Sequence, residues 1–495
     1  MEEIISPRCS LKIVLHKAFD SIHWGFIFDI LKTLNLPHTF IAWIEACFTQ
    51  TRFSISFNGT LIGYFKGAKG LRQRDPLSPY LFVLAMNILS RMLNLAAERG
   101  IFGFHPKTRK IGLTHLSFAD DLLIFCKGNI ESVVGVLSIL DQFYEVSRLK
   151  LNSFKCEIFS AGIHARTIEK VKLITGFQVG ILHVHYLGIP LVTLKLTEKD
   201  CQALIDNIKR KLHIWSGRNI SYAGRLELIN SVLFNISNYW CRQLVLPASI
   251  LKKVEQICSR FFWKGADKSA AGARISWGEI TVPKSEGGLG LKNIKTWNRA
   301  CLLSLIQKIL TGNGSLWVAW LKAYVFKEHE FWQYQAGVNV RWSIRRLLKL
   351  RTEASPIILS NPVQTRDIWN LIRFKEQKVT WHKLTWFPLH IPKLSLIAWM
   401  IILNRLPTRD RLNTMGICTD LHCVNCDTNM ESRDHLFMQC PLAADLWNAI
   451  LKLNGMNSSS MTWVEMVSKA SSTWKGRSLL TTILKISWTV FLYFI

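Results

Sequence analysis

The sequence predicts an α+β protein, with short strands near its beginning, a long run of helices after them and a compact Cys/His cluster towards its end. Around residue 120 it reads His115-Leu-Ser-Phe-Ala-Asp-Asp-Leu-Leu-Ile-Phe125, where β-branched and aromatic residues flank two adjacent aspartates. This pattern indicates two strands joined at the acidic pair. Between residues 195 and 350, apolar residues recur at helical spacing, as in Leu204-Ile205-Ile208-Leu212. Strands followed by a run of helices are typical of the α+β class.

The acidic pair, Asp120 and Asp121, lies in an otherwise apolar run. Ionised carboxylates are seldom placed there unless a metal or a charge partner compensates them. A hairpin with carboxylates at its tip suits Mg²⁺, a hard ion that takes oxygen ligands. A surface turn is the alternative, because aspartate is also common in turns.

Four further blocks of sequence surround the acidic pair in a fixed order. They are Leu11-Lys-Ile-Val14-Leu-His-Lys-Ala-Phe-Asp20, Gly70-Leu-Arg-Gln-Arg-Asp-Pro-Leu-Ser-Pro79, Leu149-Lys-Leu-Asn-Ser-Phe-Lys155 and Tyr186-Leu-Gly188. In this order and spacing they resemble the palm of reverse transcriptases, above all those of plant non-LTR retrotransposons of the long interspersed element type. The resemblance continues through Phe262-Trp-Lys-Gly265 and Pro283-Lys-Ser-Glu-Gly-Gly-Leu-Gly290 to the Cys/His cluster, so it covers nearly the whole chain.

The resemblance implies a set of domains. A partial right-hand polymerase palm of antiparallel sheet plus helices would span residues 1–190, with the fingers missing. A mainly helical thumb or connection region would span residues 191–355. A small reverse-transcriptase zinc-binding domain would span residues 362–447, and a truncated C-terminal helical segment would span residues 448–495.

The resemblance also implies RNA-directed DNA synthesis, a nucleotidyltransferase reaction that uses two Mg²⁺ or Mn²⁺ ions. Asp120 would be a principal metal ligand and Asp121 its partner. The other implied site residues are Phe19 beside the sugar 2′ position, Gln73 beside the nascent base pair, Lys155 near the triphosphate, and Tyr186 and Gly188 at the primer end.

Two positions depart from the family pattern. The family's first block opens on an aspartate, Asp-x-x-Lys-Ala-Phe-Asp, and this chain has Val14 there, so one metal-binding carboxylate is missing. Asp20 is not expected to replace it, because six strand residues would place it roughly 20 Å further along the strand. The family has Arg-Gln-Gly-Asp-Pro in the second block, and this chain has Arg74 at the glycine. Glycine often serves a positive φ, so Arg74 is expected to strain the turn.

We therefore expect a reverse transcriptase-like retroelement protein that is catalytically impaired but retains nucleic-acid and zinc binding. One alternative is an active RNA-directed DNA polymerase that uses Asp120 and Asp121 alone. Another is a non-enzymatic nucleic-acid-binding or interaction protein.

The Cys/His cluster has the spacing Cys423-x2-Cys426-x8-His435-x4-Cys440. A Cys-x2-Cys knuckle lets two thiolates share one ion, and the other two residues can complete the tetrahedral coordination of a structural Zn²⁺. Cys418 and His422 lie close enough in sequence to compete as ligands. Because four protein ligands leave no open position, we expect this zinc to stabilise the fold rather than to catalyse a reaction.

The charge balance favours a polyanionic partner. Lys and Arg number 62 against 34 Asp and Glu, a formal net charge of +28. Such an excess is typical of nucleic-acid binding, because each neutralised phosphate releases counterions. With the resemblance, it indicates RNA or an RNA–DNA heteroduplex. The twelve cysteines suit a reducing compartment, and the sequence shows no secretory signal, so we expect an intracellular protein, nuclear or cytoplasmic.

Three weaker patterns complete the predictions. Residues 478–495 are the only membrane candidate, but Lys485 interrupts them, so we expect no membrane span and instead a helix that could dock a protein partner. The run 287–290 lacks the spacing of a phosphate or dinucleotide loop and predicts a turn. A final set could contact the backbone of a nucleic acid, with core packing as the alternative for its aromatic members: Trp215, Arg218, Tyr222 and Arg225.

Overall fold

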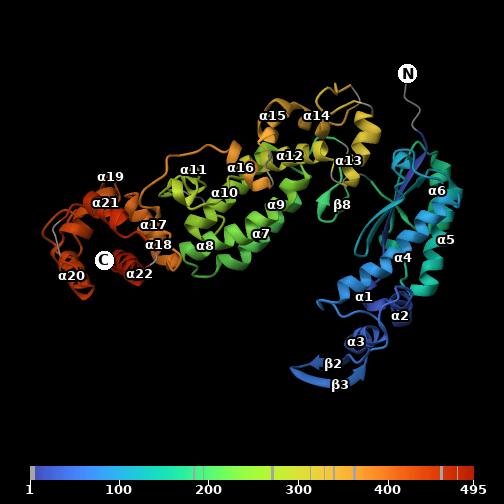
Figure 1. Cartoon of the computed structure of the whole chain (residues 1–495), viewed down its shortest axis with the longest axis horizontal. Helices are drawn as coiled ribbons and strands as arrows, with labels where there is room; N and C mark the ends of the chain where they lie inside the picture. The colour runs from blue at the N-terminus through green and yellow to red at the C-terminus, as the bar shows by residue number, and fades with distance from the viewer. Residues whose placement is uncertain are drawn as a thin grey trace. The chain divides into compact units, whose positions relative to one another are not determined.

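The computed structural model describes residues 6–181, 184–192, 194–268, 272–312, 314–327, 329–337, 340–360, 364–457, 461–476 and 478–495. The chain divides into two compact units (Figure 1). The first unit comprises residues 1–193 and 308–340, and the second comprises residues 194–307 and 341–495. All strands of the described residues lie in the first unit, and helices occur in both, so the predicted α+β class is confirmed.

A five-stranded sheet of order β4-β5-β1-β6-β7 forms the centre of the first unit. The strands are β1 (Arg8–Val14), β4 (His115–Phe118), β5 (Asp121–Lys127), β6 (Glu157–Ala161) and β7 (Gln178–Val179). β1 lies in the middle and pairs antiparallel with both β5 and β6. Burial alternates along β1, where Leu11 and Ile13 are buried and Lys12 and Val14 are partly exposed. One face of the sheet therefore carries the core, and the other can present side chains to a ligand.

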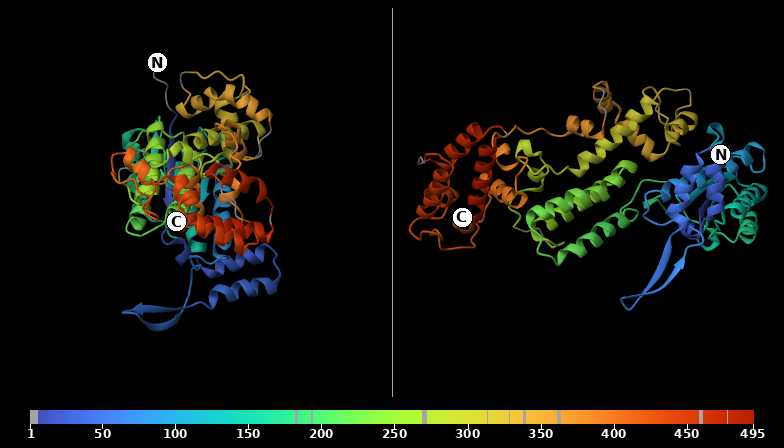
Figure 2. Two further views of the ribbon diagram at one scale, coloured as in Figure 1. Left: turned by 90° about the vertical axis from the view of Figure 1, so that its left-hand side faces the viewer. Right: turned by 60° about the horizontal axis from the view of Figure 1, so that its bottom comes forward.

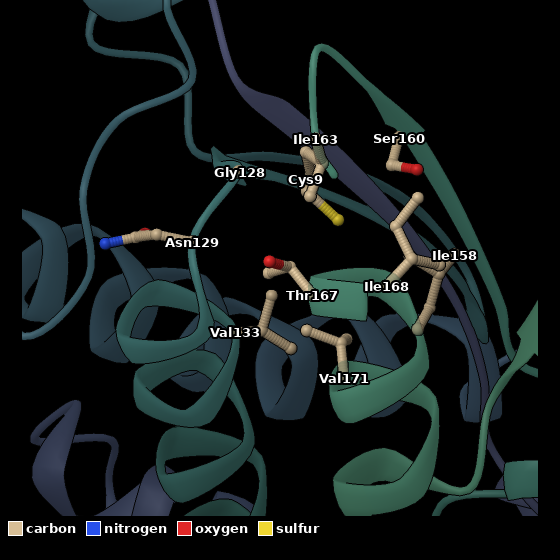
Figure 3. Close-up of a pocket in the computed structure, with 10 residues that line it drawn as sticks. All are labelled: Cys9, Gly128, Asn129, Val133, Ile158, Ser160, Ile163, Thr167, Ile168 and Val171. Atoms are coloured by element: carbon tan, nitrogen blue, oxygen red, sulfur yellow. The ribbon is translucent and has the colours of Figure 1, made fainter. Parts of the chain in front are cut away.

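Helices cover the buried face of this sheet. They are α1 (Ala18–Ser21), α2 (Trp24–Thr33), α3 (His38–Thr49), α4 (Ser78–Glu98), α5 (Ile130–Ser147) and α6 (Ala165–Thr175). Between the sheet and helices α5 and α6 lies a small cavity that is lined mainly by aliphatic side chains, together with Cys9, Asn129, Ser160 and Thr167 (Figure 3). Its volume of about 10 Å³ is a packing gap, too small for a ligand.

Among the described residues, α4 is the helix that is long and apolar enough to cross a membrane by length and composition. It buries Leu81, Phe82, Ala85 and Leu89 in the core of the first unit, as core helices do. The last helix, α22 (Leu479–Phe494), falls among the shorter apolar helices. The expectation that residues 478–495 are the only membrane candidate is therefore wrong, because it ignored the length and composition of α4.

Smaller elements complete the first unit. They are β2 (Arg52–Phe57), β3 (Thr60–Lys66), β8 (His185–Tyr186), β9 (Ile189–Pro190), α13 (Leu316–Leu321) and the short turns η1 (Arg109–Ile111), η2 (Ser153–Lys155) and η5 (Lys322–Phe326). The β2–β3 hairpin extends from the unit as an exposed arm (Figure 2). α13 and η5 dock on the loop after α4: the Trp320 indole N–H donates to the Lys107 carbonyl at 2.9 Å, and the Lys110 N–H donates to the Tyr324 hydroxyl at 2.7 Å.

The second unit is helical. Its first part contains α7 (Gln202–Ser216), α8 (Tyr222–Leu228), η3 (Ile229–Leu233), α9 (Phe234–Gln243), α10 (Ala248–Lys264), α11 (Trp277–Ile280), η4 (Lys284–Glu286), α12 (Ile294–Thr311), α14 (Trp342–Lys349) and α15 (Arg351–Leu359). α12 runs from this unit into the first. α7 buries Leu204, Ile205, Ile208 and Leu212, so the predicted amphipathic helix is confirmed.

The rest of the second unit contains α16 (Thr365–Ile372), α17 (His382–Thr385), α18 (Pro392–Ile402), α19 (Arg409–Thr414), η6 (His435–Gln439), α20 (Pro441–Leu453), α21 (Trp463–Thr473) and α22. α22 packs on α18 and buries Leu484, Trp488 and Phe491 in the core of this part. The C-terminal helix is thus a core helix along most of its length, and the large apolar side chains that it leaves exposed are Leu479, Leu480 and Ile483 near its start and Phe494 at its end.

The glycine-rich run at 287–290 is a turn, as predicted. Gly287 and Gly290 have φ values of 95° and 79°, which few other residues adopt. The turn is docked from both sides: the Arg373 guanidinium forms a two-bond ion pair with Glu286 at 2.6 and 2.7 Å, and the Trp399 indole N–H donates to the Gly287 carbonyl at 2.7 Å.

Candidate active site and metal centre

The acidic pair lies at the tip of the β4–β5 hairpin. Phe118 pairs with Asp121, which leaves Ala119 and Asp120 as a two-residue turn. Ala119 has a left-handed φ of 52°, as the first turn residue of such tight hairpins does. The two strands predicted on either side of the acidic pair are confirmed.

Val14 lies directly across from this hairpin. In the antiparallel pairing of β1 with β5, the Cα partner of Val14 is Asp121. The Val14 N–H donates to the Cys156 sulfur at 3.3 Å, which fixes the end of β1 between β5 and the start of β6. The position where the family pattern has its first aspartate therefore faces the acidic pair, and here it carries an aliphatic side chain.

An open cavity of about 510 Å³ lies on this face of the sheet, and we call it the palm cavity. Its lining comprises Lys12, Val14, Asp121, Phe154, Lys155, Glu157, Gln178, His185, Tyr186, Leu187 and Gly188. Four of the predicted site residues, which lie far apart in the sequence, thus meet at one place. Asp120, Phe19 and Gln73 are not among the lining residues.

The charges around the palm cavity are mixed. The Lys12 ammonium forms an ion pair with Glu157 at 2.8 Å. Burial raises the pKa of Asp121, and the neighbouring Asp120 raises it further, while Lys12 opposes both effects. Burial also raises the pKa of Tyr186, with a further contribution from the charge of Asp121, which lines the same cavity.

The donor set does not fit a two-metal centre. Two Mg²⁺ or Mn²⁺ ions need oxygen ligands from both sides of the site. The described residues of β1 include no carboxylate, and Val14 offers no lone pair opposite Asp121. The palm therefore lacks one of the ligands that a two-metal reaction requires.

Asp20 does not replace the missing carboxylate, but the geometric reason predicted for this is wrong. The chain leaves the strand after Leu15, turns at Lys17 with a φ of 43° and enters α1. Asp20 is therefore not carried along a strand. It lies exposed on this short helix, and its carboxylate accepts from the Gln73 amide at 3.3 Å rather than lining the palm cavity.

Arg74 occupies a glycine-like conformation, as predicted. Its φ is 70°, in the left-handed region. A residue with a Cβ there costs about 1–2 kcal/mol relative to the right-handed region. The neighbouring Gly70 is needed for another reason: a Cβ there would lie 2.7 Å from the carbonyl oxygen of Asp20.

Phe19 and Gln73 do not line the palm cavity, and each contacts a residue outside it. The Phe19 ring stacks on Phe82 with ring centres 4.5 Å apart and packs against the core. Gln73 is exposed and donates to Asp20. The roles implied for these two residues stay predictions.

The Cys/His cluster forms a compact tetrad. The ligand atoms of Cys423, Cys426, His435 and Cys440 all lie within 4.8 Å of one another. The Cys426 sulfur lies 3.3 Å from His435 Nε2. The backbone holds them in place: the Cys423 N–H donates to the Asn429 carbonyl at 2.8 Å, and the Cys440 N–H donates to the His435 carbonyl at 2.7 Å. Three sulfurs and one imidazole nitrogen at this spacing fit a structural Zn²⁺.

The two competing ligands lie outside the tetrad. The Cys418 thiol donates to the Asp420 carbonyl at 3.2 Å, and the His422 ring lies 3.0 Å from the Asp420 carboxylate. The sequence alone left these residues open as ligands, and in the structure both contact Asp420 instead of joining the tetrad.

Comparison with known proteins identifies both regions. Residues 1–191 match the reverse transcriptase (RNA-dependent DNA polymerase) family, and residues 364–447 match the zinc-binding domain in reverse transcriptases. A Pol polyprotein from a type-2 retrotransposable element of Drosophila melanogaster is 32% identical over 293 residues, which are 56% of this chain and 26% of that protein. The chain therefore carries a reverse transcriptase domain and a reverse-transcriptase zinc-binding domain, and its relatives include Pol polyproteins of retrotransposable elements. The predicted lineage and zinc-binding domain are thereby confirmed.

Two further relatives of this reverse transcriptase-like protein are similar over different lengths. A Pol polyprotein from a type-1 retrotransposable element of Nasonia vitripennis is 29% identical over 449 residues, 86% of this chain and 40% of that protein. An Arabidopsis thaliana protein named for ribonuclease H is 26% identical over 129 residues, 26% of this chain and 21% of that protein. The chain spans less than half the length of each of these relatives.

The four residues after the palm that could contact a nucleic acid are partly buried or exposed. The Trp215 ring packs on Phe261 with ring centres 5.8 Å apart, and the Tyr222 ring packs on Phe262 at 5.7 Å. The Arg225 guanidinium donates to the Phe262 carbonyl at 3.1 Å. All three side chains are partly buried against α10, and their contacts to a nucleic-acid backbone stay a prediction. Arg218 alone of the four is exposed.

Two functional features of this reverse transcriptase-like protein escaped sequence reasoning. One is the Lys12–Glu157 ion pair, which joins strands 145 residues apart and leaves no local pattern. The other is Glu431, a buried acid whose carboxylate accepts from the Arg409 N–H at 3.0 Å and the Val424 N–H at 3.3 Å. Glu431 thereby supports the turn from Cys423 to Cys426, which we call the zinc knuckle. A single acidic residue in a polar run of sequence gives no signal of such a role.

Proposed function

We propose that this protein binds RNA and RNA–DNA heteroduplex and is impaired as a polymerase. The pairing of Val14 with Asp121 is the observation that carries the proposal. The family's metal-dependent chemistry needs a carboxylate at each of these two positions, and this chain has only one.

The electrostatic cost of the missing carboxylate is large. Two divalent ions about 4 Å apart repel each other by roughly 17 kcal/mol at an effective dielectric constant of about 20. Bridging carboxylates offset this repulsion, and one of them is absent. The Lys12 ammonium adds a positive charge on the same face, and Glu157 balances that charge by direct pairing rather than remaining available to a metal.

Nucleic-acid binding does not need those metals. The net charge of +28 favours binding to nucleic acid whatever its base sequence. The family match favours a template–primer duplex as the ligand. An intracellular location, nuclear or cytoplasmic, belongs to the same proposal and is supported by the twelve cysteines, none of which forms a disulfide among the described residues. A protein partner at the C-terminal helix has narrower support, which comes from the exposed apolar side chains of Leu479, Leu480, Ile483 and Phe494.

Primer extension on a poly-rA/oligo-dT duplex, with Mg²⁺ or Mn²⁺, tests the proposal. The unmodified chain is compared with the double variant Val14→Asp/Arg74→Gly, and the same double variant with Asp121→Asn is the control. We expect no product from the unmodified chain, product from the double variant and none from the control.

Extension by the unmodified chain would overturn the proposed impairment and favour a polymerase that uses the hairpin aspartates alone. If neither chain extends the primer while both bind the duplex with a strong salt dependence, the function is non-enzymatic nucleic-acid binding.

A further inference from the structure

Helix α14 carries a dense cluster of positive charge in the second unit. From Arg341 to Arg351 the chain has five basic residues and no acidic one. Arg341, Arg345, Arg346 and Lys349 are exposed, and we call these four residues the basic stripe. The nearest following acid, Glu353, is already paired with Arg299 at 2.6 Å.

The basic stripe is a regular row. Arg345 and Lys349 are four residues apart on α14, so they lie on one face of the helix with a rise of about 6 Å between them. Arg341, four residues before Arg345, is the N-cap residue and extends the row just beyond the first turn. Arg346 flanks the row on the same exposed side. Within the described part of the chain, Arg341, Arg346 and Lys349 make no salt bridge, so their charges are not neutralised internally.

The opposite face of α14 packs against the rest of the second unit. Ile344 and Leu347 are buried, as is Leu350 just after the helix. The remaining aromatic, Trp342, is partly buried beneath the Lys195 ammonium, which lies 5.9 Å from the ring centre. A basic amphipathic helix can otherwise insert in a membrane surface or in an apolar groove of a protein, but both need a free apolar face.

A polynucleotide backbone is the ligand that fits the exposed basic stripe. Its phosphates repeat at regular intervals, and a row of cations can neutralise several of them at once. Three of the four stripe residues are arginines, whose planar guanidinium groups bind phosphate oxygens in pairs. Because the stripe presents only charge, it would contact the backbone without reading base sequence.

We propose that the basic stripe of α14 is a sequence-independent docking surface for the phosphodiester backbone of nucleic acid. This inference rests on the proposed function for the class of ligand. It adds a defined contact surface, carried by residues outside the palm cavity.

Fluorescence anisotropy with labelled 20-nucleotide RNA, DNA of the same sequence and the RNA–DNA duplex tests this inference, over KCl concentrations from about 50 to 300 mM. The stripe variant is Arg341→Gln/Arg346→Gln/Lys349→Gln. The matched control, Lys452→Gln/Lys469→Gln/Lys475→Gln, removes the same net charge from exposed lysines of the same unit.

We expect the stripe variant to reduce the slope of log K against log[KCl] by about 2–3, because each lost phosphate contact contributes about 0.7–0.9. The control variant should change the slope by less than about 1. A charge-keeping variant, Arg341→Lys/Arg346→Lys, should retain the original slope. Should the triple variant fail to fold, Arg346→Gln alone is expected to reduce the slope by about 0.7–0.9.

Equal slope changes in the stripe and control variants would overturn the inference and leave the proposed function standing. Failure of the unmodified chain to bind any of the three nucleic acids would overturn both. Loss of binding to phosphatidylserine vesicles by the stripe variant, with RNA binding unchanged, would also overturn it and identify a lipid surface as the ligand.

Discussion

At the scale of single residues, two substitutions distinguish this chain from the reverse transcriptase pattern, and the backbone treats them differently. Val14 fits its strand without strain, and only the chemistry of its side chain is wrong for the family's reaction. Arg74 has the chemistry of an ordinary surface residue but holds a φ of 70°. Val14 should therefore alter activity alone, whereas Arg74 should also lower the stability of the first unit.

Arg74→Gly is expected to stabilise the first unit by about 1 kcal/mol, because glycine adopts a positive φ without the Cβ clash. The midpoint of urea unfolding measures this effect. Arg72→Gly is the matched control, since Arg72 is exposed in the same loop and does not have a positive φ. It should be neutral or slightly destabilising. The strain argument fails if both variants lower the midpoint equally.

At the scale of elements, the zinc knuckle is the local structure whose stability depends most on a bound ion. Cys423 and Cys426 come from a tight turn, His435 begins η6 and Cys440 follows its end, and the stretch between the turn and η6 is mainly polar. The buried Glu431 carboxylate ties the knuckle to the start of α19 through the Arg409 N–H. Metal binding and folding of this part should therefore be coupled.

Zinc removal is expected to unfold residues 364–447 selectively. The purified chain should contain one zinc per molecule, Cys440→Ser should lower this content to near zero, and Cys418→Ser should leave it unchanged, because Cys418 lies outside the tetrad. Atomic absorption measures the metal content. Protease sensitivity after chelation should rise in the same segment and nowhere else. Loss of zinc in Cys418→Ser would show that the ligand set is wrong.

Elements with a local pattern could be predicted from the sequence, and long-range pairings could not. The alternation around Asp120 and the spacing of Leu204 to Leu212 gave the hairpin and α7, because neighbouring residues carry those signals. The pairing of Val14 with Asp121 joins strands more than 100 residues apart. It followed only from the family resemblance, and the Lys12–Glu157 pair, which the resemblance does not include, was missed.

At the scale of the whole molecule, the chain combines an intact zinc tetrad with an incomplete set of metal ligands in the palm. The division into units could not be read from the sequence, because residues 308–340 join the first unit through contacts with a loop some 213 residues earlier. The resemblance gave the order of the domains, and their limits as first expected stay predictions. The account's central claim is that one missing carboxylate weakens metal binding in an otherwise formed palm.

Titration of the zinc-loaded chain with Mn²⁺, followed by the electron paramagnetic resonance signal of the free ion, tests this claim most directly. Val14→Asp should tighten Mn²⁺ binding about tenfold or more, equivalent to about 1.4 kcal/mol, because it adds a carboxylate opposite Asp121. Val14→Asn, which adds no charge, should bind Mn²⁺ as weakly as the unmodified chain. Equal Mn²⁺ affinity in the unmodified chain and in Val14→Asp would contradict the account.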